Sequence, residues 1–187
     1  MNKKKILGII VLIVSSISAS AQTNQTLPEL NVIKEFNFAT QYSCGGGYEK
    51  SALFLSEYSK DMNSPELLYN GTCQDNAYID VNTHGGNFSL VSDLGDVPLE
   101  DVTASKTLNW SNIVGGDNSF HETTTVKLNH TYAVFYTSGD IEALYNFKIV
   151  AYDSNGPMTI RYAVKKYQIN PSLEESQGFA WEIGNHH

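Results

Sequence analysis

The sequence predicts an all-β fold, an antiparallel β-sandwich or barrel-like domain with little helix. Three runs of alternating apolar and polar residues follow one another within residues 123–169, with short turn signals between them. Shorter apolar runs precede them at about ten-residue spacing, separated by clusters of turn-forming residues. Before the C-terminus a helix is plausible only at residues 99–106, which lack a 3.6-residue apolar stripe, so we expect a loop or a single turn there.

The three runs at residues 123–169 predict a β-meander at the C-terminal end of the domain. Because successive side chains of a strand point to opposite faces, each run assigns one set of residues to the core. The expected core side chains are Tyr132, Val134 and Tyr136, then Tyr145, Phe147 and Ile149, then Met158, Ile160, Tyr162 and Val164. The same register points Asn146, Lys148 and Arg161 to solvent.

The segments before the meander predict shorter strands. The first apolar stretch begins within residues 32–38 and is followed by a turn that contains the consecutive glycines at residues 45–47. Two short apolar runs, residues 52–55 and 66–69, enclose a turn-rich segment. Residues 78–82 alternate once more and indicate another short strand.

The N-terminus has the pattern of a secretory signal peptide at residues 1–21. Three lysines at residues 3–5 precede an apolar run at residues 6–14, and small residues follow as far as Ala21. The apolar run is shorter than the roughly 20 apolar residues that span a bilayer. We therefore expect cleavage after Ala21 and a protein that is secreted or periplasmic, not embedded in a membrane.

The chain after the signal peptide divides into three predicted segments. Residues 22–31 have little apolar content and predict a flexible leader. Residues 32–170 predict one all-β domain, of a size that can bury a substantial core. Residues 171–187 follow the meander, and we expect this C-terminal segment to pack on the sheet or to extend it, covering an edge that would otherwise be open.

The charge of the mature chain argues against nucleic acid as a partner. Cleavage removes three of the 12 basic residues and leaves nine against 20 acidic ones, a net charge of −11. Such a surface repels phosphate backbones and anionic lipids. The acidic residues are scattered along the sequence, which is typical of a solvated surface.

Two cysteines, Cys44 and Cys73, predict one disulfide in an exported chain. Their bridge would close a loop of roughly thirty residues, which stabilises the fold by about 3 kcal/mol on the chain-entropy estimate. The alternative is a reactive or metal-binding pair. The sequence has neither a C-x-x-C motif nor a flanking basic residue to activate a thiol.

No catalytic signature is complete in this sequence. His121-Glu122 begins an H-E-x-x-H zinc motif, but Thr125 occupies the position of the second histidine. A G-x-S-x-G nucleophile elbow is absent. We therefore predict that the protein is not an enzyme; a secreted hydrolase without a recognisable motif is the third of the hypotheses.

The leading hypothesis is a non-catalytic exported β-domain that acts as a binding or cell-envelope interaction module. The 11 tyrosines would supply contact surface where they are exposed, and the expected contact residues are Tyr48, Tyr58 and Tyr78. The ligand would be a protein or a glycan, and no cofactor is required. The alternative is a haem or metal carrier, because imidazole is a common metal ligand; its candidate residues are His84, His121 and His130.

The strand-turn-strand pattern of residues 131–162 resembles the C-terminal strands of HmuY-like bacterial exported β-proteins. The resemblance rests on the runs at residues 131–139, 145–150 and 159–162. It implies an exported β-fold. Members of that family that bind haem do so through a pair of axial side chains on loops, and no such pair can be placed on particular residues of this sequence.

Overall fold

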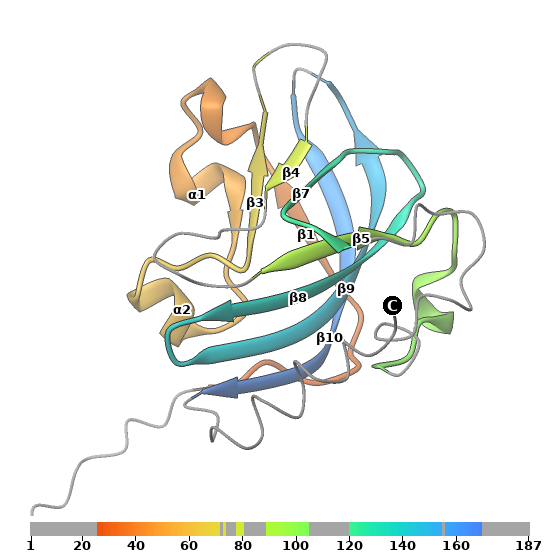
Figure 1. The fold of residues 1–187 in the computed structure, drawn as a ribbon. Coiled ribbons are helices and arrows are strands. Elements are labelled where there is room, and N and C mark those ends of the chain that lie inside the picture. Colours follow the sequence, from red (N-terminus) through yellow and green to blue (C-terminus); the bar gives the residue numbers. More distant parts are fainter. Residues whose placement is uncertain are drawn as a thin grey trace, which may run out of the picture.

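Two antiparallel β-sheets form the fold in a computed structural model, which describes residues 26–71, 73, 78–80, 89–104, 120–154 and 156–169 (Figure 1). The larger sheet has the order β1 (Lys34–Phe38), β10 (Met158–Ile169), β9 (Ile141–Tyr152), β8 (Thr131–Ser138), β5 (Leu90–Asp93), β6 (Phe120–His121). The smaller sheet has the order β2 (Ala52–Leu53), β3 (Leu67–Asn70), β4 (Tyr78–Asp80), β7 (Thr123–Thr125). The prediction of an all-β antiparallel fold is confirmed.

The predicted meander is the centre of the larger sheet. β8, β9 and β10 pair in sequence order and run side by side as the long curved strands of Figure 1. Phe147 lies opposite Tyr132 on one side and Tyr162 on the other, and the Tyr132 and Phe147 rings stack at a centroid distance of 4.9 Å. All the side chains predicted for the core face are buried except Tyr162, which is partly buried against the same cluster.

The smaller sheet closes one face of the larger sheet. Leu67, Tyr69 and Ile79 from β3 and β4 are fully buried in the same apolar cluster as the inward side chains of the meander. A core shared by two sheets is the arrangement of a sandwich-like fold.

Part of the opposite face of the larger sheet, around Asn146, is also buried, and this corrects one prediction. Asn146 has no exposed surface, and its amide donates to the Val102 carbonyl at 3.4 Å. Val102 belongs to a second apolar cluster with Leu94 and Ala133. The assignment of Asn146 to solvent is therefore wrong, because the chain segment that includes the short 3₁₀ turn η2 (Leu99–Asp101) packs over this side of β9 and β10, and Val102 after it packs against Ala133 of β8.

Lys148 and Arg161 lie at the margin of that covered face. The Lys148 amine donates to Asp96 at 2.8 Å and to the Val97 carbonyl at 3.2 Å, while its side chain keeps 19% of its surface exposed. The Arg161 guanidinium donates to Glu100 at 2.9 Å and is more exposed. Both side chains point away from the core between the sheets. Arg161 reaches solvent as predicted, whereas the Lys148 side chain is largely covered.

Two short helices occur where the sequence predicted turns: α1 (Gly47–Ser51) and α2 (Glu57–Asp61). The expectation that residues 99–106 are the one plausible helical site before the C-terminus is therefore wrong, although η2 confirms a single turn there. Ser56 caps α2, since its hydroxyl accepts from the Ser59 N–H at 3.1 Å and the Ser59 hydroxyl accepts from the Ser56 N–H at 3.3 Å. A capping box is usually recognised by Glu or Gln three residues after the cap. Because Ser59 occupies that position, the sequence did not indicate this one.

The predicted disulfide between Cys44 and Cys73 is confirmed, with their Cα atoms 5.4 Å apart. It joins the 3₁₀ turn η1 (Tyr42–Cys44) to the chain that follows β3. Buried Gln41 reinforces the junction, because its side chain accepts from the Cys73 N–H at 3.2 Å and donates to the Ser154 carbonyl at 2.7 Å.

The predicted signal peptide and the predicted C-terminal segment at residues 171–187 lie outside the described residues. The last residues of the predicted leader are described. Leu30 forms an isolated parallel bridge with Val164, and the Asn31 N–H donates to the Val164 carbonyl at 2.8 Å. This end of the leader is therefore held against β10.

Candidate functional site

An aromatic groove of about 420 Å³ opens where α1, α2 and the strands β1 and β2 meet. Figure 1 shows both helices at the same edge of the molecule. The apolar lining consists of Phe36, Tyr48, Ala52 and Phe54. Ser56 contributes a hydroxyl, and the remaining lining residues are Glu49, Glu57, Lys60 and Asn63. Aromatic walls with a few polar groups are typical of binding sites for small ligands.

Tyr48 is the middle of a row of three rings, of which Tyr48 and Phe54 line this groove. Its ring stacks on Tyr42 at a centroid distance of 5.2 Å and meets the edge of Phe54 at 6.4 Å. Tyr42 is 41% exposed, and Tyr48 and Phe54 are each partly exposed, so the row is accessible from solvent. Burial, and then the neighbouring Tyr42 phenol, raise the pKa of the Tyr48 hydroxyl, which therefore stays a neutral hydrogen-bonding group.

The local chain path fixes the position of Tyr48. The disulfide holds η1, and Gly45 ends it in the left-handed conformation, with φ of 80°. A Cβ on Gly46 would lie 2.1 Å from the Ser51 hydroxyl oxygen and 2.9 Å from the Gln41 carbonyl oxygen, so this position requires glycine. The triple glycine therefore lets α1 start directly after the disulfide turn and presents Tyr48 to the groove.

A buried hydrogen-bonded chain leads inward from the floor of the groove. The Ser56 and Tyr167 hydroxyls lie 2.6 Å apart, and Tyr167 donates to Glu66 Oε1 at 2.9 Å. The other carboxyl oxygen, Oε2, accepts from the Leu55 N–H at 2.9 Å, and the Tyr145 hydroxyl donates to the Glu66 backbone carbonyl. The hydroxyl and carboxyl groups of this hydrogen-bonded network all have partners, as a buried network requires.

Glu66 is a buried carboxyl that the sequence did not reveal. It has no exposed surface, and burial raises its pKa to about 7, although hydrogen bonds from Leu55, Tyr167 and Ser59 oppose this rise. In the sequence it begins the run Glu66-Leu67-Leu68-Tyr69, where it reads as the polar end of a strand. The one feature of the sequence that could have indicated a buried carboxyl is the position of this acidic residue next to an apolar strand.

The structure separates the three tyrosines predicted to contact a ligand. Tyr48 lines the aromatic groove. Tyr58 lies on α2, packs partly against the core and donates to Asp140 Oδ2 at 3.1 Å, so it anchors the helix to the turn between β8 and β9. Tyr78 lies partly exposed on β4, between β3 and β7. Phe36 and Phe54 were not predicted as groove residues, because Phe36 lies on β1 and Phe54 follows β2, and only the fold brings them together.

The histidines of the alternative hypothesis do not form a recognisable metal centre within the described part of the chain. His84 lies outside that part. His121 is exposed on β6, and His130 is partly exposed just before β8. Among the described residues, no group of three or more His, Cys, Asp and Glu side chains could hold a metal ion.

His130 instead belongs to a hydrogen-bonded cluster around buried Asp93. The Asp93 carboxylate lies 2.8 Å from His130 Nδ1 and 2.7 Å from the Lys127 amine, and it accepts from the Gly95 N–H at 2.8 Å. Burial alone would raise the pKa of Asp93, but these partners outweigh it and lower the pKa. The cluster ties the start of β8 to the end of β5.

Comparison with known proteins gave no match to a family model, to a curated protein or to a solved structure. The resemblance to HmuY-like proteins therefore stays a prediction. Within the described ranges, no helix is long and apolar enough to cross a membrane.

Proposed function

We propose that this protein is an exported, non-catalytic binding domain whose aromatic groove takes a saccharide ligand. The observation that carries the proposal is the row of rings centred on Tyr48, which is open to solvent and bordered by carboxylates, an amine and an amide. A sugar ring has one apolar C–H face and a rim of hydroxyls. It can therefore pack on an aromatic face while its hydroxyls bond to the polar groups around it.

The charges of the groove favour a neutral ligand. Glu49, Glu57 and Lys60 all line the groove, so carboxylates and an ammonium group are both present. A strongly acidic ligand would meet the two carboxylates, and a strongly basic one would meet the amine. Neutral hydroxyl groups can accept from Lys60 and donate to the carboxylates without either repulsion.

Export of the protein agrees with the proposed function, and the disulfide supports export. A disulfide persists in oxidising compartments, where the predicted signal peptide would deliver the chain. The bridge also holds the turn that leads into α1, which restricts the conformations open to the chain that carries Tyr48. Pre-organisation of this kind reduces the entropy lost on binding.

A glycan array probed with the mature protein, residues 22–187, tests the proposal. The wild type should bind one group of related neutral oligosaccharides, and Tyr48→Ala should lose at least about tenfold of that affinity, as expected for an aromatic residue at the centre of a site. Tyr78→Ala is the matched control, since Tyr78 is a partly exposed strand tyrosine outside the groove.

Two results would contradict the proposal. One is the absence of binding to any neutral glycan on the array, and the other is equal binding by wild type and Tyr48→Ala. A Soret shift on titration with haemin would instead support the haem-carrier alternative.

A further inference from the structure

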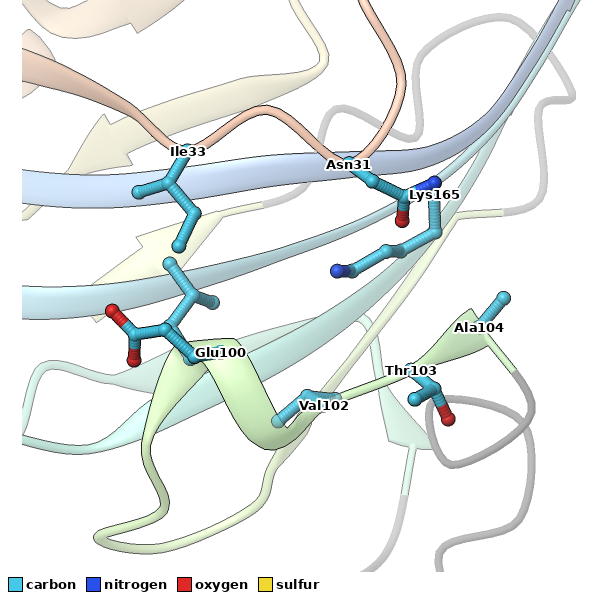
Figure 2. A pocket seen from close by; sticks show the side chains of 8 residues that line it. Asn31, Ile33, Glu100, Val102, Thr103, Ala104 and Lys165 are labelled. Atoms are coloured by element: carbon cyan, nitrogen blue, oxygen red, sulfur yellow. The ribbon is translucent and has the colours of Figure 1, made fainter.

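A second pocket, of about 360 Å³, lies at the outer face of the larger sheet, away from the residues that line the aromatic groove. Figure 2 shows its two sides: the chain before β1 with β10 on one side, and the η2 segment on the other. Its apolar wall is made by Ile33, Leu99, Val102 and Ala104. The polar groups are on Asn31, Glu100, Thr103 and Lys165. We call this cavity the Lys165 pocket.

A β-bulge directs Lys165 into this pocket. Along the β9–β10 ladder Val164 pairs with Tyr145 and Lys166 pairs with Leu144, so Lys165 is the extra residue between two paired ones. A bulge changes the direction of the side chain it carries. In Figure 2 the Lys165 amine extends into the space between Ile33 and Val102.

Asn31 is fixed beside the bulge by a second unusual backbone feature. Its φ is 61°, in the left-handed region that asparagine tolerates better than most residues. Its N–H donates to the Val164 carbonyl at 2.8 Å, which ties the chain before β1 to the bulge. The Asn31 amide and the Lys165 side chain therefore line the same part of the pocket (Figure 2).

The amine of Lys165 has no hydrogen-bond or ion-pair partner among the residues that the structure describes. Desolvation lowers its pKa, which is the response of an ammonium group next to an apolar wall. Glu100 is the acidic residue of the pocket lining, and it already accepts from Arg161 at 2.9 Å. An ammonium group that lies near an apolar surface and has no carboxylate partner in the described protein is suited to bind an anionic ligand.

We propose that the Lys165 pocket binds a small carboxylate that carries an aliphatic group. The carboxylate would pair with the Lys165 ammonium and accept from the Asn31 amide, and the aliphatic part would cover Ile33 and Val102. Pairing with an anion restores the charge stabilisation that the amine loses through desolvation. The pocket volume is in the range of small-molecule sites, at the lower end of roughly 300–1,000 Å³.

Titration of the mature protein with hexanoate, followed by amide NMR shifts and by calorimetry, tests this site. Hexanoate should shift the amides of Asn31, Val102 and Lys165, and hexanol, which has the same chain without the charge, should bind at least about tenfold more weakly. Lys165→Met keeps an apolar stem and removes the amine, so it should weaken hexanoate binding about tenfold. Lys50→Met is the matched control, because Lys50 is an exposed lysine on α1 outside this pocket.

Asn31→Asp is a second variant, which avoids any loss of packing. The change is isosteric, it suits the left-handed backbone, and it provides a carboxylate beside Lys165. It should therefore raise the melting temperature slightly and reduce hexanoate affinity about tenfold or more.

The site would be disproved if hexanoate shifted no amide of the pocket, or if hexanol bound as tightly as hexanoate. It would also be disproved if both Lys165→Met and Asn31→Asp bound hexanoate like the wild type. Loss of binding in the two pocket variants, with wild-type binding in Lys50→Met, supports it. The proposed saccharide binding at the aromatic groove is independent of this site, so its failure would leave the expected hexanoate results unchanged.

Discussion

Replacement of Glu66 by glutamine should abolish much of the pH dependence of stability between pH 4.5 and 7. Glu66 has no exposed surface, and burial raises its pKa from the ordinary 4.5 to about 7. The folded state therefore binds a proton that the unfolded chain has released at these pH values. The stabilisation is fully present below pH 4.5 and is lost as the pH rises through 7.

The magnitude follows from the two pKa values. A tenfold change in proton affinity is worth about 1.4 kcal/mol, so a rise from 4.5 to about 7 corresponds to about 3 kcal/mol of unfolding free energy. Glutamine reproduces the hydrogen bonds of the protonated carboxyl. Its carbonyl can accept from the Leu55 N–H, and its amide can donate to the Tyr167 oxygen, whose hydroxyl can then donate to Ser56.

The assay is urea unfolding of the mature wild type and of Glu66→Gln at pH 5 and pH 8. The two proteins should have nearly equal stability at pH 5, and the variant should be more stable by about 2–3 kcal/mol at pH 8. The phenols of Tyr136, Tyr145 and Tyr167 lie close to Glu66, and burial raises the pKa of each, that of Tyr136 to about 12, so they stay neutral over this range.

Glu122→Gln is the control for this experiment, since Glu122 is exposed in the bend between β6 and β7. It should leave the pH profile unchanged. A stability difference between wild type and Glu66→Gln that is the same at both pH values would refute the argument, because it would show that Glu66 does not change its protonation within this range.

Three further predictions concern the core, the disulfide and export. Phe147→Ala removes a fully buried ring from the shared core and should cost about 3–5 kcal/mol in urea melts, whereas Lys148→Ala should change stability little; a more damaging Lys148→Ala would contradict the core assignment. The double change Cys44→Ser, Cys73→Ser should cost about 3 kcal/mol, and labelling of the non-reduced, denatured wild type should detect no free thiol. Intact mass of the exported protein should correspond to a chain that begins at Gln22, and a mass that retains residues 1–21 would show that the cleavage prediction is wrong.

The inward face of the meander could be predicted because it depends on a local rule. Alternation along a strand assigns Tyr145 and Phe147 to one side, and the structure buries both. The environment of the other side depends on what packs there. Asn146 is buried because the chain around Val102 lies over it. The alternation of residues along β9 carries no information about that contact.

The candidate sites were harder to predict, since each is assembled from distant segments. Tyr48 was identified from its residue type, but the groove also needs Phe36 from β1 and Phe54 after β2. No pattern in the sequence singles out Lys165, and the bulge that directs it inward is a property of the pairing of β10 with β9. Burial of the Glu66 carboxyl was equally hard to predict, because it depends on Tyr167, which is 101 residues away in the sequence.

The most direct test of the proposed function is calorimetric titration with the neutral oligosaccharide that binds best on the array. The mature wild type should bind it at one site, Tyr48→Phe should keep most of the affinity, and Tyr48→Ala should lose at least about tenfold. This order is expected because the ring of Tyr48, stacked on Tyr42 and open to the groove, provides the contact surface. Equal dissociation constants for the wild type and Tyr48→Ala would contradict the assignment of the aromatic groove as the binding site.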